Sequence, residues 1–544
     1  MPCSKRLLFA HALVLLPAVA GAQTFRSADS VIRRMWQVGI EQSQTEKLAQ
    51  VLADSIGPRL SGTPGFQAAV DWLERTYNGW GVPVRREKYG TWRGWRQGTV
   101  HMEMIAPRVQ NLEVELLAWS PPTPKNGPVE GAVVVIPELA DAAAVTQWLG
   151  TVRGKFVLVS PPEIMCRAPQ ELERYARPAT VTKINAQRVE TQRAGLARLK
   201  PFAAADTPIQ ALTRIVQMRL DSAGVIGIGT LTWSGGWGVD KIFGANAERV
   251  PTVDISCEDY GLLHRLATKN QGPRVRLTAE SQATPAEVPM FDVVARIEGK
   301  ELPNEYVLLS AHLDSWHGAT GATDNGTGTL TMLEAMRILR EAYPKPKRTI
   351  LVGHWSGEEE GEVGSKAFAE DHPEVTKGLQ ALFNQDNGTG RIRGINGGGL
   401  VHSPEHINDW LGKIPKEFSA QINGGNPVQS GRPAGGGSDD FSFGCSGLPA
   451  FGLGATPWDY GTVTWHTERD TYDKVVFDDL KYNATLTAML VYLASEDPMR
   501  IPLDRVDLAA QAARGGGPGG GRGFGSTTWP ECEKAPRKTE PRLK

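Results

Sequence analysis

Several short segments in the second half of the chain place histidine and acidic residues directly after apolar stretches. The candidates for chemistry are His312, Asp314, Asp324, Glu358, Glu359, Asp386 and His466. Imidazole and carboxylate groups suit zinc, although ligand type alone leaves manganese and cobalt open. A carboxylate beside such ligands can also move protons. The set therefore indicates metal-assisted chemistry, of which hydrolysis is the simplest form.

The spacing within this set suggests how the chemistry could be divided. His312 is followed two residues later by Asp314, which suits a metal ligand and a carboxylate that fixes its ring. Asp324 stands in a Gly-flanked loop ahead of a helical pattern; there a carboxylate could bridge two cations or, more simply, cap the helix. Glu358 and Glu359 are adjacent, so one can bind metal while the other moves protons. Taken singly, each segment also has an ordinary structural explanation.

The fold has to bring these segments together. Strand-like apolar runs at residues 306–311, 349–355 and 379–383 alternate with helical patterns such as residues 328–342. Nearly continuous apolar strands separated by helices predict an α/β domain with a mostly parallel, mixed sheet flanked by helices. In open sheets of this kind ligands bind beyond the carboxyl ends of the strands. The candidate residues follow those ends, so we expect them to converge.

The length of 544 residues predicts more than one folded domain. Short β-type runs after Pro121 and a charged helical stretch over residues 179–219 indicate a separate middle module. We predict a signal peptide at 1–22, the N-terminal part of the catalytic domain at 23–120, an inserted module at 121–287, the main catalytic part at 288–508 and a Gly-rich flexible tail at 509–544.

The N-terminus has the pattern of a secretory signal. Lys5 and Arg6 precede an apolar run over residues 7–20 and small residues up to Ala22, a run too short for a membrane span. We therefore expect a secreted or periplasmic protein with no membrane segment after signal removal. Cleavage would leave Cys166, Cys257, Cys445 and Cys532. Four cysteines in so long a chain are not a disulfide scaffold, and we expect them to be incidental.

Composition argues against a nucleic-acid partner. The formal net charge is −1, whereas a nucleic-acid-binding domain usually carries a basic excess. The Gly- and Arg-rich residues 514–526 are interpreted as a flexible tail. His402 and His406 are four residues apart, but Glu does not follow His402, so the H-E-x-x-H zinc helix is absent.

Taken in order, the segments resemble the dizinc aminopeptidases and glutamate carboxypeptidases. The matching motifs are His-Leu-Asp-Ser-Trp at 312–316, Gly-Ala-Thr-Asp at 321–324, Glu358-Glu359 with Gly361, Val363 and Gly364, then Asp386, His466, Gly-Pro-Arg-Leu-Ser-Gly at 57–62, and Ser438-Asp439 with Phe441. The resemblance covers most of the mature chain. It implies the zinc-exopeptidase type of α/β fold with an inserted, β-rich protease-associated domain.

The resemblance also implies two zinc ions and their ligands. One ion would be held by His312 and Asp386. The other would be held by Glu359 and His466, and Asp324 would bridge the two. In relatives the peptide bond after the bridging Asp is often cis, so the same is expected at Asp324.

From the same resemblance, Glu358 is the expected general base and later acid for a zinc-bridging water, and Asp314 is expected to orient His312. The implied function is an exported dinuclear-zinc exopeptidase that cleaves dipeptides or short peptides from a free amino terminus. The implied partners are a short peptide substrate and a second copy of the chain in a homodimer.

Two other functions share parts of this pattern. A glutaminyl-cyclase-like zinc acyltransferase resembles the segment at 321–324, and a receptor-like homologue would be non-catalytic. The complete set of ligands favours the peptidase. The chain departs from the family at Asp440, where relatives often have His, and in the length of residues 179–219. From their charge and position, Arg432 and the loop to Asp440 are candidates for binding a substrate carboxylate.

Overall fold

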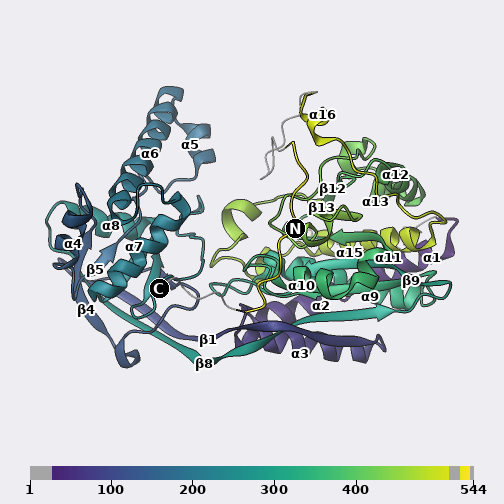
Figure 1. Cartoon of the computed structure of the whole chain (residues 1–544), viewed down its shortest axis with the longest axis horizontal. Coiled ribbons are helices and arrows are strands. Elements are labelled where there is room, and N and C mark those ends of the chain that lie inside the picture. Colours follow the sequence, from purple (N-terminus) through teal and green to yellow (C-terminus); the bar gives the residue numbers. More distant parts are fainter. Residues whose placement is uncertain (1–26, 514–526, 539–544) are drawn as a thin grey trace, which may run out of the picture.

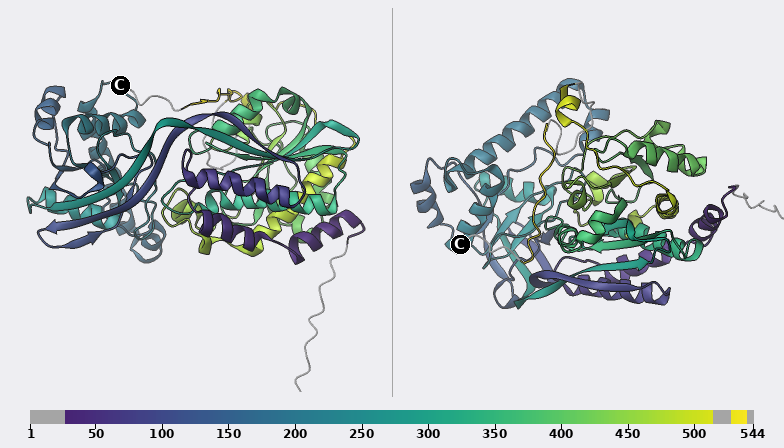
Figure 2. Two further views of the ribbon diagram at one scale, coloured as in Figure 1. Left: turned by 90° about the horizontal axis from the view of Figure 1, so that it is seen from below. Right: turned by 45° about the vertical axis from the view of Figure 1, so that its right-hand side comes forward.

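The computed structural model describes residues 27–513 and 527–538, so the predicted signal peptide at 1–22 lies outside the described residues. The molecule has two lobes, joined by two long antiparallel strands, β1 (Val84–Ala106) and β8 (Arg274–Ile297). Figures 1 and 2 show these strands running from one lobe into the other. Within the described residues no helix is both long and apolar enough to cross a membrane.

The larger lobe is built on a mixed sheet. Its strands lie in the order β12-β13-β11-β9-β10-β8. The central ones, which are parallel to one another, are β9 (Leu302–His312), β10 (Arg348–Trp355), β11 (Leu379–Asn384) and β13 (Ala450–Ala455). The antiparallel neighbours are β8 and β12 (Ile392–Ile395). Every residue of β10 is buried, as expected for a sheet covered on both faces. The predicted α/β fold with a mixed sheet is confirmed.

Alternate residues of β9 show how the two faces are covered. Val307 and Leu309 pack in one apolar cluster with Leu333 of α9 (Thr327–Ala342) and Leu486 of α15 (Phe477–Glu496). Leu308 points the other way and packs with helices on the opposite face. The other helices of this lobe are α1 (Ser30–Trp36), α2 (Thr45–Gln50), α3 (Pro64–Gly79), α10 (Val363–Asp371), α11 (Pro373–Gly378), α12 (Ser403–Lys413), α13 (Lys416–Ser419), α14 (Phe441–Gly444) and α16 (Leu508–Ala513).

The smaller lobe, which we call the insert lobe, has its own apolar cluster. Its strands are the outer part of β1 and β8 with β2 (Gln110–Leu112), β3 (Val114–Leu116), β4 (Val129–Val135), β5 (Phe156–Leu158), β6 (Gly227–Thr230) and β7 (Thr252–Ile255). Its helices are α4 (Ala142–Leu149), α5 (Pro169–Tyr175), α6 (Pro178–Leu199), α7 (Ile209–Ala223) and α8 (Cys257–Thr268). The long charged stretch that the sequence singled out forms α6 and α7, which stand out in Figure 1.

The segment after Pro121 does not act as a linker. Thr123 is buried, and its backbone N–H donates to the carbonyl of Ala279 in β8 at 2.9 Å. The lobes are connected instead by β1 and β8, whose pairing continues through both. The boundaries at 121 and 287 therefore cut through packed structure, and the protease-associated type of the insert stays a prediction.

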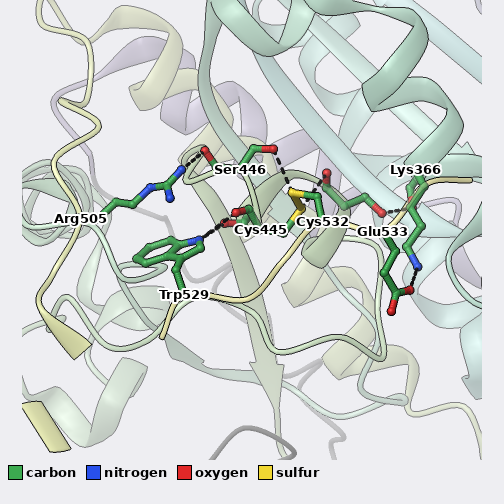
Figure 3. Close-up of a disulfide and its surroundings, with 10 residues drawn as sticks. Lys366, Cys445, Ser446, Arg505, Trp529, Cys532 and Glu533 are labelled. Atoms are coloured by element: carbon green, nitrogen blue, oxygen red, sulfur yellow. Dashed lines mark hydrogen bonds and ion pairs between the residues drawn. A yellow bond between two sulfur atoms is a disulfide. The ribbon is translucent and has the colours of Figure 1, made fainter. Parts of the chain in front are cut away.

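The four cysteines among the described residues all form disulfides, which corrects the expectation that they are incidental. Cys166 pairs with Cys257 in the insert lobe, and Cys445 pairs with Cys532. The second bond fixes residues 527–538, here called the C-terminal strap, to the larger lobe (Figure 3). The strap lies within the tail that the sequence predicted to be flexible. A count of cysteines could not show this, because pairing depends on distances in the folded chain.

Side chains on both sides of this disulfide hold the strap in place. The indole of Trp529 donates to the carbonyl of Cys445 at 2.9 Å, and the carboxylate of Glu533 pairs with the ammonium of Lys366 at 2.8 Å (Figure 3). Further along, the guanidinium of Arg537 pairs with Glu370 and Asp371 of α10. The strap is thus part of the packed larger lobe.

Candidate metal centre

The candidate residues converge at the carboxyl ends of the parallel strands, as the sequence predicts. His312 is the last residue of β9, and Glu358 and Glu359 follow the end of β10. Asp386 follows the end of β11 by two residues. His466 comes from the loop after β13, just beyond the turn Tyr460–Thr464. Parallel strands end at the same edge of a sheet, so the first three positions meet there as a direct result of the fold.

One group of side chains surrounds His312. Its Nε2 atom lies 3.4 Å from Oδ1 of Asp386, 3.7 Å from Oδ1 of Asp324 and 3.8 Å from Oε2 of Glu358. His312, Glu358 and Asp386 have the spacing of a group that could hold a metal ion. Since the Nδ1 atom of His312 donates to the carbonyl of Asp314 at 3.0 Å, Nε2 is left as the nitrogen that can bind a cation.

A second group surrounds His466. Its Nε2 atom lies 3.1 Å from Oε2 of Glu359 and 3.4 Å from Oδ2 of Asp324. These three residues also have the spacing of a metal-binding group. Asp324 belongs to this second group and also lies beside the first, because its Oδ1 atom faces His312 and its Oδ2 atom faces His466. The peptide bond between Asp324 and Asn325 is cis, as the family resemblance implies.

Hydrogen bonding within the described residues leaves part of this cluster unsatisfied. His312 Nε2, Asp324 Oδ2 and Glu359 Oε1 are buried and make no hydrogen bond. Buried polar atoms without partners are costly. Imidazole and carboxylate donors that converge in this way fit divalent cations of the zinc type. The donor set and its unpaired atoms therefore match the metal centre that the sequence predicts.

The charges of the cluster point the same way. Burial raises the pKa of both Asp324 and Glu359 to about 8, and the pKa of Glu358 well above its usual range, with neighbouring carboxyl groups adding to each shift. Burial lowers the pKa of His312, but Glu358 and Asp386 outweigh it and raise that pKa well above its ordinary value. So many buried carboxyl groups ionise together only when positive charge is supplied. Cations between them would supply it.

Asp314 positions more than the His312 ring. Its carboxylate accepts hydrogen bonds from the backbone N–H groups of Glu358 and Glu359, both at 3.3 Å. The same carboxylate lies 3.6 Å from Nδ1 of His312, farther than the Asp314 carbonyl. The expected role in orienting His312 is therefore shared with the backbone, and the carboxylate also fixes the glutamate loop.

Arg59 is a supporting residue that the sequence singled out only as part of the motif at 57–62. Its guanidinium is fully buried and donates to the carbonyls of Leu313 at 2.7 Å, Thr320 at 2.7 Å and Gly321 at 2.8 Å. Burial lowers the pKa of Arg59 to about 10. The side chain ties the loop after His312 to the loop that carries Asp324.

Asp470 is a second supporting residue, and sequence reasoning gave it no role. Its carboxylate accepts hydrogen bonds from the backbone N–H groups of Thr323 and Asp324, both at 2.8 Å. The only signal in the sequence was its place at the end of the acidic segment that contains His466. Its partners lie about 146 residues away, so spacing could not reveal the contact.

The remaining sequence candidates have other surroundings. Ser438 accepts a hydrogen bond from the amide of Asn384 at 2.8 Å, next to the Asp386 segment. Burial and the nearby charge of Asp386 raise the pKa of Asp440 to about 7, so this departure from the family lies beside a candidate ligand. His406 bonds to Asp497 at 2.8 Å and belongs to neither metal-binding group.

The fold and this site define a protein class. Residues 292–491 match the model of peptidase family M28, so the part of the chain that carries the candidate metal centre is similar to the metallopeptidases of this family. Among individual proteins it is similar to carboxypeptidase Q of Bos taurus, with 26% identity over 352 residues, 64% of this chain and 66% of that protein. The chain thus spans slightly less than two thirds of the length of this curated relative.

Solved structures show the same fold. A peptidase M28 precursor from Shewanella amazonensis SB2B has a TM-score of 0.63 and 23% identity, covering 87% of this chain and 97% of that chain. BSAP, a zinc aminopeptidase from Bacillus subtilis, has a TM-score of 0.52 and 17% identity, and the match covers 85% of this chain and 97% of that chain. The resemblance that the sequence motifs predict is therefore found in the family model that matches residues 292–491 and in the fold.

Proposed function

We propose that the protein is an exported dinuclear-zinc exopeptidase that hydrolyses dipeptides or short peptides from a free amino terminus. One observation carries the proposal: Asp324 directs its two carboxylate oxygens at two histidines, each of which has further carboxylates of its own. A carboxylate placed in this way offsets the repulsion between two neighbouring cations. The names of the similar proteins, a carboxypeptidase and a zinc aminopeptidase, support both the metal and the exopeptidase activity.

The two groups give each ion its ligands. His312 and Asp386 would hold one zinc, Glu359 and His466 would hold the other, and Asp324 would contact both. A bound zinc pair supplies a Lewis acid that acidifies water and polarises the peptide carbonyl. Asp314 and Arg59 keep the ligand loops in place through the backbone contacts described above.

Glu358 is the proposed proton carrier. Its carboxylate takes a proton from the attacking water as the new O–C bond forms at the peptide carbonyl. It then gives that proton to the departing amine nitrogen as the C–N bond breaks. Burial raises the pKa of Glu358 well above its usual range, and a carboxyl group tuned upward is suited to holding a proton between the two steps.

Two features support an exported protein. The disulfides Cys166–Cys257 and Cys445–Cys532 are typical of an oxidising compartment. The pattern of residues 1–22 predicts a secretory signal. A homodimer, which the family resemblance implies, stays a prediction, and so does the absence of a nucleic-acid partner.

The test replaces Glu358 by Gln in zinc-loaded protein. Glu358→Gln is expected to lower kcat for free dipeptides about 10²- to 10⁴-fold and to keep the metal content, because the neighbouring ligands remain. Glu405→Gln, at an exposed site, is the control. Near-normal hydrolysis by metal-replete Glu358→Gln would show that Glu358 is not the proton carrier.

A panel of peptides tests the reaction itself. It contains free dipeptides, longer peptides, amino-blocked peptides and one peptide that begins with glutamine, followed by mass spectrometry. Loss of free dipeptides or single amino-terminal residues, with blocked peptides intact, supports the proposal. Release from the carboxyl end of blocked peptides indicates a carboxypeptidase, and loss of ammonia from the glutamine peptide alone indicates a cyclase.

A further inference from the structure

A segment of the insert lobe, residues 232–246, is hydrogen-bonded to the loop that carries His466. The backbone N–H of Ile242 donates to the carbonyl of His466 at 2.7 Å, and Lys241 forms an antiparallel bridge with Thr467. The hydroxyl of Ser234 donates to the carbonyl of Thr462 at 2.7 Å. The insert lobe is therefore fixed against the candidate metal centre at its His466 side.

This contact brings a lysine of the insert lobe to the centre. The Lys241 ammonium lies 3.7 Å from the ring centroid of Trp465 and 3.3 Å from the carbonyl of Gly461. Among the residues that the structure describes, no carboxylate lies within 4.0 Å of this ammonium. Burial lowers the pKa of Lys241 to about 8, against an opposing attraction from Asp324. The Lys241 ammonium therefore has room for a further anionic partner.

Aromatic rings surround the same place. The Phe243 ring lies 5.2 Å from that of His466 and 5.7 Å from that of Trp316, and Trp465 lies 4.1 Å from His466. Phe243 is 36% exposed and Trp465 is 37% exposed. These rings present apolar surface beside a candidate metal ligand without being sealed in the core. An apolar side chain of a ligand could pack there while its charged end meets Lys241.

The charge of Lys241 contrasts with that of the rest of the site. The carboxylates of the metal-binding groups serve the expected cations, so they offer no partner to a substrate carboxylate. An ammonium with a free donor provides such a partner at one side of the site. Lys241 lies beside Trp465, which directly precedes the candidate ligand His466. Consecutive Cα atoms are about 3.8 Å apart, so a carboxylate that reaches Lys241 would belong to a residue close to the cleaved bond.

From this juxtaposition we propose that Lys241 binds the free α-carboxylate of the residue that follows the cleaved bond, with its side chain against Phe243 and Trp465. The preferred substrates are then free dipeptides that end in an apolar residue. The inference rests on the proposed function and deepens it, because it assigns the substrate class and names a specificity residue in the insert lobe.

The test compares alanyl-leucine with its C-terminal amide, using zinc-loaded wild type, Lys241→Met and Lys241→Arg. Loss of a charge-assisted hydrogen bond is expected to raise KM for alanyl-leucine about 10- to 100-fold in Lys241→Met, with kcat within about threefold. Lys241→Arg restores most of the binding, because it keeps the charge and the donors. The amide has no carboxylate and should show similar KM values in all three proteins.

A second readout does not depend on turnover. Calorimetric titration of free leucine, the expected product, should give weaker binding to Lys241→Met than to wild type, while leucinamide binds both alike. Lys183→Met, an exposed lysine on α6, is the matched control and should leave both readouts unchanged. Zinc content and thermal stability of Lys241→Met should equal those of wild type.

The outcomes separate this inference from the proposed function. If wild type cleaves no peptide in the panel, the proposed function fails whatever Lys241 does. If wild type cleaves alanyl-leucine and its amide equally well and Lys241→Met changes neither, the peptidase stands and the role of Lys241 is overturned. An equal rise in KM for acid and amide would also overturn it, because it would indicate a structural effect on the His466 loop.

Discussion

The two halves of the metal centre are held in different ways. The His312 half stands on the ends of core strands, and the His312 side chain is 1% exposed. The His466 half stands on a loop, where His466 has a positive φ of 62° and a side chain that is 13% exposed. That loop is supported by the insert lobe, and its Asp470 side chain joins it to the loop that carries Asp324. One half is thus a product of the sheet, and the other depends on parts of the chain that are distant in sequence.

Electrostatics separates the halves as well. The carboxyl groups around His312 raise its pKa well above its ordinary value, whereas burial lowers the pKa of His466, and the nearby Lys241 charge adds to this. The His312 half is therefore the more strongly negative environment, and we expect it to bind a cation more tightly than the His466 half.

The largest effects are expected from removing each histidine. His312→Ala and His466→Ala should each lower kcat/KM for free dipeptides by about three orders of magnitude. Their zinc contents should differ: His466→Ala keeps about one zinc per chain in the buried half, and His312→Ala keeps less. Mass-spectrometric metal analysis after dialysis checks this, with His402→Ala as control. Equal zinc contents in the two variants would remove the distinction between the halves.

A medium effect is expected at the support of Asp324. In Asp470→Asn, an NH₂ group replaces one of the two carboxylate oxygens that accept hydrogen bonds from the backbone N–H groups of Thr323 and Asp324. One of these hydrogen bonds is lost, so the backbone at Asp324 is positioned less firmly. Loss of such an outer partner should lower kcat/KM or zinc affinity about 10- to 100-fold. Kinetics with zinc titration measure it, and Asp459→Asn, at an exposed site, serves as control. Unchanged zinc affinity and kinetics would show that Asp324 is placed by its own loop.

The smallest effect concerns the insert lobe beside the His466 half. Asp240 is 5% exposed, and its Oδ1 atom has no partner among the described residues. Burial and nearby carboxyl groups raise its pKa to about 10. The carboxyl groups that act on it are those of Asp254, Glu468, Glu258 and Glu113.

Because the folded protein binds this proton more tightly than the unfolded chain, Asp240 favours the folded state at low pH, and this contribution is lost as pH rises toward 10. Asp240→Asn cannot ionise, so its Tm relative to wild type should rise between pH 5 and pH 9, by about 2–4 °C. Thermal unfolding of zinc-loaded proteins measures this, with the exposed Asp206→Asn as control. A Tm difference that is the same at all pH values would contradict the assignment.

The contrast between the halves also explains what the sequence could predict. His312, Glu358, Glu359 and Asp386 follow apolar strands directly, so the sheet pattern alone placed them together. His466 was assigned through the family resemblance, because no strand pattern leads to it. The fold class followed from alternating strands and helices. In each case a local pattern or a motif carried the prediction.

What the sequence missed are contacts between distant segments. Arg59 donates to carbonyls about 260 residues away, and Lys241 lies beside Trp465 across the two lobes. The disulfide Cys445–Cys532 joins residues 87 positions apart. Nothing in the local sequence marks such partners, since they are fixed by how complete elements pack. The expectation of a free C-terminal tail failed for the same reason.

The C-terminal strap has a consequence for biosynthesis. The backbone N–H of Thr91 donates to the carbonyl of Arg537 at 3.0 Å, so a strand made early in translation is completed by residues made near the end. Cys445 likewise can form its disulfide only after Cys532 has been synthesised. The contacts between the strap and the larger lobe can therefore form only after nearly all of the chain has been synthesised. A chain cut short before the strap leaves Cys445 unpaired, a chemical mark by which an unfinished molecule differs from a finished one.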